Sequence, residues 1–259
     1  AAELVALDRW AIARTQALQQ EISAAYRDYA FHLIYQKIHN FCVVDLGGLY
    51  FDILKDRLYT LPAESRARRS AQTAMWHIAE SMVHWLAPIL SFTAEEMWGY
   101  LHGQRPESVF LSTWHELPSL PARDIDWAAL IALRTDVARE LERLRVAGQI
   151  GAPLDAELSI WCAPAQYRQL NALGEELRFF MITSKAVVHT QDEPLPDDAV
   201  PALGVGGGDV RIRVRVAEDP KCGRCWHHRP EVGASSEYPE LCARCIGNLA
   251  FPGETRQFS

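Results

Sequence analysis

Cys222-Gly223-Arg224-Cys225 and Cys242-Ala243-Arg244-Cys245, separated by sixteen residues, form the most informative stretch of this sequence. Two residues between cysteines allow one tight turn to direct both sulfurs at one ion. Two such pairs at this spacing are typical of a zinc site with four thiolates. Two redox-active pairs or disulfides of a secreted domain are the alternatives, but the pairs lie close together and nothing else marks secretion. The sequence predicts that Cys222, Cys225, Cys242 and Cys245 ligate one Zn²⁺.

The predicted zinc site is structural. Four thiolate ligands leave no open coordination position for water or substrate. Residues 218–259 contain few large apolar side chains, so metal binding is expected to supply much of their folding free energy. The bound thiolates would carry net negative charge, which Lys221, Arg224 and Arg244 could offset.

Composition predicts a soluble, globular protein of a reducing cytoplasm. Hydrophobic residues make up 49% and charged residues 23% of the chain, as in ordinary globular proteins. No apolar run reaches the length of a membrane span, and no signal peptide precedes the first helix. Cys42 and Cys162 lie in apolar contexts and are predicted to be buried free thiols.

The charge distribution limits how the chain could bind nucleic acid. A net charge of −7 argues against a binder that uses its whole surface. Two segments are locally basic, residues 55–69 with five cations against two acids and residues 221–259 with five against four. Binding through local patches therefore stays open.

Residues 3–104 are predicted to form an antiparallel helix bundle. The first helix is expected from Glu3 to about Tyr29, because this segment is rich in strong helix formers. Gly47-Gly48 is a predicted break or close-packing point in the next helical segment. Thr93 and Glu96 have the spacing of a capping box and predict a helix start there.

Residues 105–122 lack periodicity and predict a linker across the bundle, with an extended piece at Val109–Trp114. Asp124–Ala147 predicts a helix that places five apolar residues on one face. The apolar residues are Leu130, Leu133, Val137, Leu141 and Leu144.

From residue 152 the pattern changes to that of a small α/β subdomain. Strands are predicted at Leu154–Cys162, Ala186–His189 and Arg211–Val216, with short helices at Pro164–Ala172 and Gly174–Phe180. Residues 191–209 are acidic and rich in Pro and Gly, which predicts a mobile loop.

The predicted fold is therefore mainly α, in four parts. Residues 1–122 form the helical bundle with its trailing linker, and residues 123–151 a connecting helix. Residues 152–217 form the α/β subdomain, and residues 218–259 a four-cysteine zinc finger or ribbon.

Several runs resemble bacterial isoleucyl-tRNA synthetases of class I. Lys37–Cys42 and Tyr50–Arg57 resemble their anticodon-binding helical domain, and Leu86–Trp98 resembles a run shared with the valine and leucine enzymes. Lys221–His227, together with Cys242–Cys245, resembles the C-terminal zinc finger of the isoleucine enzymes.

The resemblance implies a protein that joins isoleucine to its tRNA with ATP. However, the His-Ile-Gly-His and Lys-Met-Ser-Lys-Ser motifs that serve this chemistry are missing, and His77-Ile78-Ala79-Glu80 only begins alike. We therefore expect the C-terminal part of a longer enzyme, with no catalytic residues of its own and ATP needed only by the whole. Its expected partners are the anticodon stem-loop of tRNA(Ile) and the rest of the synthetase, with neither membrane nor DNA.

Ten residues are candidates for RNA contact, because cations bind phosphates and aromatic rings stack on unpaired bases. Each has an alternative role: a solvated helix or strand face, charge compensation beside zinc, or, for the tryptophan, a lid on the small core. The candidates are Arg66, Arg68, Arg69, Arg211, Arg213, Arg215, Arg224, Trp226, Arg244 and Arg256.

Three other classes of protein remain as alternatives. A free-standing, non-enzymatic module of zinc finger and helix bundle would share the same features. Formamidopyrimidine-DNA glycosylases have a similar zinc finger, but they need an N-terminal Pro-Glu pair and a β-rich front half, where this chain has Ala1-Ala2-Glu3 and helices. The valine and leucine enzymes match the bundle but are disfavoured by the zinc pattern.

Overall fold

The computed structural model describes residues 4–120, 125–205 and 209–259 in two compact units. One unit comprises Ala1–Leu58 and Ala63–Ala122, and the other Tyr59–Pro62 and Arg123–Ser259. Residues Ala1-Ala2-Glu3 lie outside the described residues. So does the predicted boundary between residues 122 and 123. The division into four parts stays a prediction. Among the helices of the described residues, none is both long and apolar enough for a membrane span.

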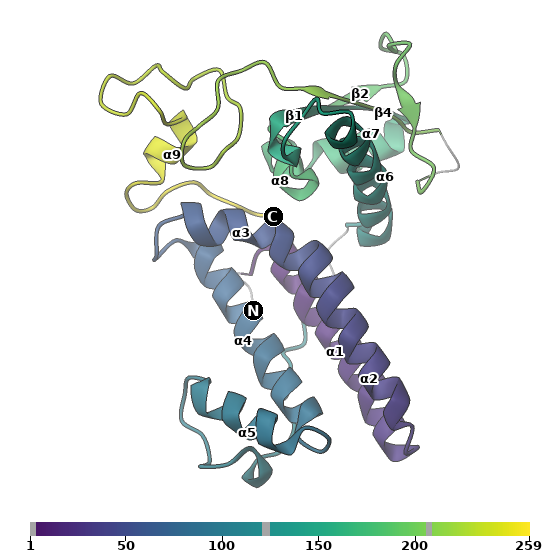
Figure 1. The fold of residues 1–259 in the computed structure, drawn as a ribbon, viewed down its shortest axis with the longest axis vertical. Helices are drawn as coiled ribbons and strands as arrows, with labels where there is room; N and C mark the ends of the chain where they lie inside the picture. The colour runs from purple at the N-terminus through teal and green to yellow at the C-terminus, as the bar shows by residue number, and fades with distance from the viewer. Residues whose placement is uncertain (1–3, 121–124, 206–208) are drawn as a thin grey trace. The chain divides into compact units, whose positions relative to one another are not determined.

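The first unit is helical, as predicted (Figure 1). Its α-helices are α1 (Ala6–Arg27), α2 (Phe31–Asn40), α3 (Phe51–Thr60), α4 (Arg66–Leu86) and α5 (Ser91–Tyr100), although the end of α3 from Tyr59 onward belongs to the second unit. A π-helix, η1 (Phe41–Tyr50), joins α2 to α3, and a 3₁₀ turn, η2 (Val109–Leu111), follows α5. Helix α1 packs against both α2 and α4.

The Gly47-Gly48 pair does not break the helix but lies inside the π-helix. A Cβ at Gly47 would lie 3.1 Å from the Cys42 carbonyl oxygen, and one at Gly48 would lie 3.3 Å from that of Val43. Both distances are tight for a Cβ contact, so glycine relieves crowding within the wider helical turn. The prediction of a close-packing point is confirmed, and that of a break is wrong.

The capping box predicted at Thr93 and Glu96 is wrong. Helix α5 begins at Ser91, so Thr93 lies inside its first turn, and the capping position is taken by Leu90 without a side-chain cap. The Ser91 hydroxyl donates to the Ala87 carbonyl oxygen (3.0 Å) and the Leu90 amide to that of Leu86 (2.7 Å). These bonds to the end of α4 start the helix earlier than the local pattern indicates.

The chain after α5 lies along the bundle, as predicted, although Val109–Leu111 is a 3₁₀ turn and not extended. Gln19 Nε2 donates to the His115 carbonyl oxygen (2.9 Å), and Trp114 packs edge-on against Tyr26 with ring centroids 5.8 Å apart. Nδ1 of His77 and Nε2 of His115 are 2.8 Å apart. Residues 112–115 therefore contact both α1 and α4.

A buried ion pair joins four helices of this unit. Asp8 and Arg57 have exposed fractions of 0% and 1%, and two hydrogen bonds of 2.7 and 2.9 Å link them. The Tyr50 hydroxyl donates to the same carboxylate (2.8 Å), and so does that of Ser70. The Val5 amide in turn donates to Ser70 (2.9 Å). One carboxylate on α1 thus holds η1, α3 and α4.

The second unit consists of a small mixed sheet with helices, followed by the cysteine-rich segment. Its helices are α6 (Trp127–Val146), α7 (Pro164–Asn171), α8 (Leu177–Met181) and α9 (Ala243–Gly247), with 3₁₀ turns η3 (Pro153–Asp155) and η4 (Gly174–Glu176). Its strands are β1 (Ala156–Cys162), β2 (Lys185–Thr190), β3 (Val200–Pro201) and β4 (Arg211–Val216). The strand order is β2-β1-β4-β3, with β1 parallel to β2 and antiparallel to β4.

The predictions for α6 are confirmed over its described length. Its five predicted apolar residues are all buried. Glu140 pairs with Arg143 (2.8 Å) and Glu142 with Arg145 (2.7 Å) on the exposed side. Asp126 caps the helix by accepting from the Ala129 amide (3.0 Å). Residue 124, the predicted start, lies outside the described residues.

The stretch 191–209 is only partly the loop that composition predicts. Val200–Pro201 pairs with β4 as an edge strand, and the Gly204 amide donates to Asp136 on α6 (2.7 Å). The prediction of a loop is wrong at Val200–Pro201, because β4 provides a strand partner, and Gly204 is held by a contact to a segment distant in sequence. Residues 206–208 lie outside the described part of the chain.

The two remaining cysteines differ in exposure. Cys162 on β1 is buried, as predicted, and burial raises the pKa of its thiol to about 11. The prediction that Cys42 is buried is wrong, since this residue is partly exposed, although partial burial raises the pKa of its thiol.

Replacing Asp8 by Ala should destabilise the first unit by about 3–5 kcal/mol, because Arg57 would stay buried without its counter-charge. Urea unfolding followed by amide hydrogen exchange in α1 and α4 measures the change. The matched control is Glu142→Ala, which removes a solvent-exposed ion pair and should leave the midpoint almost unchanged. Equal effects of the two substitutions would contradict the role of the Asp8 network.

The first unit should lose stability as the pH falls from about 6.5 to about 4. Burial, and then the neighbouring His115, lowers the pKa of His77 from its ordinary value of 6.5 to about 4. Within this window the unfolded state takes up a proton that the folded state does not, so acidification favours unfolding. Unfolding at a series of pH values tests this, and His77→Asn should flatten the dependence. A variant with the parent's pH dependence would refute it.

Candidate metal centre and nucleic-acid interface

The four cysteines of the two Cys-x-x-Cys pairs converge in the second unit. Their sulfur atoms all lie within 4.8 Å of one another, and all four residues are buried. The sulfurs of Cys225 and Cys242 are 3.8 Å apart. A Zn–S bond of about 2.3 Å implies sulfurs about 3.8 Å apart in a tetrahedron, so the cluster has the dimensions of a zinc site.

Local backbone geometry shapes each cysteine pair. In the first pair, the Trp226 amide donates to the Cys222 carbonyl oxygen (3.0 Å), and Trp226 adopts a positive φ of 65°. In the second, Cys242 precedes α9, and the Ile246 amide donates to its carbonyl oxygen (3.1 Å). The Cys242 amide donates to the Cys222 sulfur (3.3 Å), which joins the two pairs.

The thiols of this cluster also shift one another's pKa values. Hydrogen bonds from the thiols of Cys225 and Cys245 hold the pKa of Cys242 well below its ordinary value. The same interaction with Cys242 raises the pKa of Cys225.

The neighbouring histidines have other contacts. His227 packs edge-on against Phe179 (centroids 5.3 Å apart), and its Nδ1 lies 3.2 Å from the Cys225 carbonyl oxygen. Nε2 of His228 lies 3.3 Å from the Asp155 carboxylate. The four-sulfur cluster is complete without either ring.

With the fold and cluster established, comparison with known proteins identifies the family. A family model described as the anticodon-binding domain of tRNA ligase matches residues 8–160. The chain belongs to this family. A second model, described as a zinc finger found in FPG and IleRS, matches residues 219–247, the segment that holds the four cysteines. The zinc-finger match and the sulfur cluster together identify a structural Zn²⁺ as the cofactor of this segment.

Relatives resemble the chain along nearly its whole length. The isoleucine–tRNA ligase of Halorhodospira halophila is 55% identical over 99% of this chain. Those of Nitrosococcus oceani and Alkalilimnicola ehrlichii are 52% and 49% identical over 100% and 99% of it. The chain spans about 28% of the length of these three relatives.

The basic patch predicted around residues 55–69 is smaller than its sequence indicates. Arg57 is buried in the ion pair with Asp8, and Lys55 pairs with Asp52 (2.7 Å). Arg66 and Arg69 in the first turn of α4 are exposed, and Arg68 is half-buried. The cations offered to solvent therefore lie mainly at the start of α4.

Of the two candidate arginines in the second half of the zinc segment, Arg256 is buried and Arg244 is partly buried. Arg244 donates to Glu254 (2.9 Å) and Thr60 (2.6 Å), and Arg256 donates to Glu254 (3.0 Å) and to the Ser259 carbonyl oxygen (3.0 Å). Both guanidinium groups lie over the ring of Phe179, at 4.7 and 3.3 Å. Both guanidinium groups therefore bond within the protein, and the contact of Arg244 and Arg256 with RNA stays a prediction.

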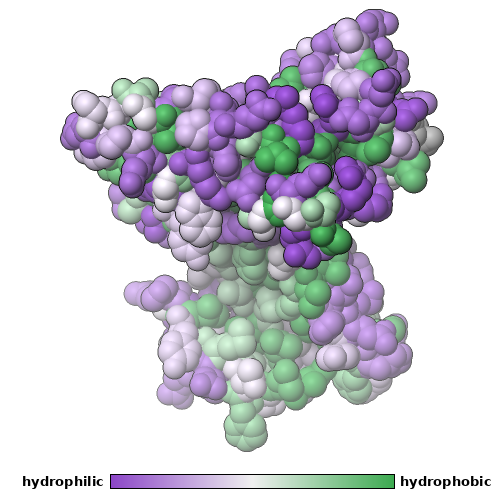
Figure 2. Space-filling model, turned by 45° about the horizontal axis from the view of Figure 1, so that its top comes forward, coloured by the Kyte–Doolittle hydropathy of each residue, from purple (hydrophilic) through white to green (hydrophobic). Residues whose placement is uncertain are grey.

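The remaining candidates are at least partly exposed. Arg224 is half-buried, whereas Trp226 is 63% exposed beside the cluster. On β4, Arg213 pairs with Asp198 (2.9 Å) and Arg215 with Glu157 (2.8 Å). Figure 2 shows mostly hydrophilic residues on the face that the second unit presents in that view.

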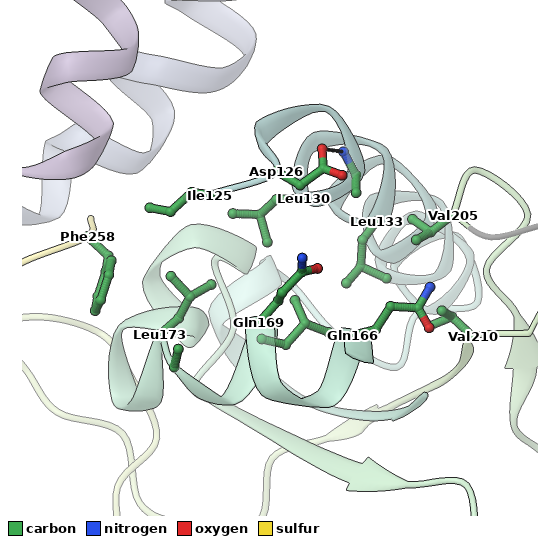
Figure 3. A pocket seen from close by; sticks show the side chains of 13 residues that line it. Ile125, Asp126, Leu130, Leu133, Gln166, Gln169, Leu173, Val205, Val210 and Phe258 are labelled. Carbon is green, nitrogen blue, oxygen red and sulfur yellow. Dashed lines mark hydrogen bonds between the residues drawn. The ribbon is translucent and has the colours of Figure 1, made fainter. Parts of the chain in front are cut away.

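An apolar pocket of about 130 Å³ lies in the second unit. Figure 3 shows Leu130 and Leu133 of α6 facing Gln166 and Gln169 of α7, with Phe258 at one side. Asp126, the charged residue on its wall, is engaged in capping α6. Its lining, among the described residues, is mostly apolar and contains no pair of an acid and a base.

Serine in place of Cys242 should lower the zinc content below one per chain and unfold residues 218–259, because zinc binding supplies folding free energy there. Elemental analysis of the reduced parent should give one zinc per chain, and amide NMR signals report folding of the segment. The control, Cys42→Ser, should keep the metal. A folded segment in a reduced, zinc-free chain would overturn this prediction.

Proposed function

We propose that this chain is the tRNA-binding part of an isoleucine–tRNA ligase and that it positions the anticodon stem-loop of tRNA(Ile). The observation that supports this most is that an anticodon-binding domain and a four-cysteine zinc segment occur in one chain, as the family matches describe. In the whole enzyme, isoleucine is joined to its tRNA with ATP by a catalytic part that lies outside these 259 residues.

The zinc-segment match is described as shared by FPG and IleRS, so it does not by itself separate the two. The anticodon-binding match over residues 8–160 favours a tRNA ligase over a DNA glycosylase. The names of the relatives favour isoleucine over valine or leucine. A reducing cytoplasm is the proposed location, because it keeps the thiols free for zinc.

The burial or exposure of each candidate side chain suggests its role. Cys222, Cys225, Cys242 and Cys245 ligate zinc, which holds the surrounding segment in shape. Trp226 is presented on this segment with an exposed ring, which suits stacking on an unpaired base. Arg66 and Arg69 at the start of α4 and Arg211 on β4 are exposed, which suits contact with phosphates.

The chain should bind an isoleucine anticodon stem-loop, and binding should weaken as salt rises because phosphate contacts release counterions. Arg69→Ala should reduce the slope of log affinity against log salt by about one. Trp226→Ala should weaken binding about tenfold through loss of stacking. Fluorescence anisotropy with labelled RNA at several salt concentrations measures both effects.

Arg143→Ala is the control, since it removes an exposed arginine that is paired on α6 and is not a candidate. Its affinity and salt slope should match those of the parent. Equal affinity for unrelated stem-loops would instead indicate a general RNA-binding module, and no binding of RNA would overturn the proposed function.

A further inference from the structure

The sheet of the second unit has one apolar face and one basic face. Directly paired residues of neighbouring strands project on the same side of a sheet. Ile160 and Ile212 are paired and fully buried, on the side where α6, α7 and α8 pack. Trp161 is paired with both His189 and Arg211, so these three form a row on the opposite side.

The three arginines on this basic face are not equivalent. Arg213 and Arg215 are each engaged with a carboxylate. Arg211 is exposed and, within the described part of the chain, its side chain has no hydrogen bond or ion pair. It is therefore the arginine of β4 whose charge is available to a ligand.

Arg211 borders a cavity of about 330 Å³. The other walls are the aromatic Trp161, the aliphatic Leu195, the amide Gln191 and the carboxylate Asp209. This volume lies near the lower end of the range for ligand sites, about 300–1,000 Å³. It suits a ligand of the size of one nucleotide.

The wall of this cavity is held in place. The Trp161 ring stacks on His189, with centroids 4.7 Å apart and planes at 15°. Its Nε1 donates to the Pro194 carbonyl oxygen (3.1 Å), which ties the chain after β2 to the sheet. The cavity therefore has a preformed aromatic and aliphatic wall beside three polar groups.

We propose that this cavity takes one unpaired nucleotide of a bound RNA, an inference that rests on the proposed function. The base enters beside Trp161 and Leu195, Asp209 and Gln191 bind its polar edge, and the Arg211 guanidinium binds its phosphate. Unpaired bases are recognised in this way, by apolar walls and hydrogen bonds to the base edge.

The Asp209 carboxylate favours a nucleotide over a simple anion as the ligand of this cavity. Asp209 would repel a phosphate, so a site for anions alone would not contain it. A carboxylate accepts two hydrogen bonds side by side. Guanine offers two adjacent N–H donors, at N1 and at the exocyclic N2, and is therefore the base that suits Asp209.

The test uses the zinc-loaded chain and two versions of the isoleucine anticodon stem-loop that differ at one loop position, with guanosine in one and inosine in the other. Inosine lacks the exocyclic amino group. The parent should bind the guanosine hairpin about tenfold more tightly, the worth of one good base contact. Asp209→Asn should abolish this difference, and Arg211→Ala should weaken the binding of both RNAs about tenfold through loss of a phosphate contact.

Arg168→Ala on α7 is the matched control, since Arg168 lies on the helical side and does not line the cavity. It should bind like the parent. If Asp209→Asn keeps the preference, or Arg211→Ala binds like Arg168→Ala, the cavity is not the site while the proposed function stands. A parent chain that binds neither hairpin overturns both. Circular dichroism and zinc content confirm that each variant is folded.

Discussion

The helical unit depends on a single carboxylate without exposed surface. Asp8 accepts hydrogen bonds from Tyr50, Arg57 and Ser70, which lie on three different helical segments. An ionised group is tolerated in the interior only when its charge and its lone pairs are satisfied. The helices must therefore meet in the one arrangement that brings these donors together. The same pairing removes Arg57 from the surface and leaves the start of α4 as the exposed basic end of that segment.

Charged side chains also organise the cysteine-rich segment, where two arginines share one carboxylate. Arg244 and Arg256 share the Glu254 carboxylate and cover Phe179, whose ring also contacts His227 beside the cluster. Zinc with four thiolates carries net negative charge, so interior cations are compatible with this segment where an apolar core is lacking. Neighbouring residues of this segment therefore differ in role: Arg244 and Arg256 bond within the protein, while the Trp226 ring is exposed to solvent.

Features set by short-range pattern were predicted well. The apolar face of α6 and the strand β4 have the predicted positions, because helical and strand periodicity record which side of an element is buried. The predictions that failed involve contacts from outside the local window. Helix α5 starts early because its first residues bond to the end of α4, and β3 exists because β4 provides a partner for it.

The sequence by itself determined the zinc chemistry, the helical character of the front half and the family resemblance, since spacing and periodicity are local properties. Only the tertiary structure decided which charges are available. Arg57 pairs with Asp8, 49 residues away in the sequence. Arg244 and Arg256 bind Glu254, and Arg211 lines a cavity together with Trp161. A cation's role depends on the carboxylate that reaches it and on its burial. Both are consequences of how distant elements pack, which no local pattern encodes.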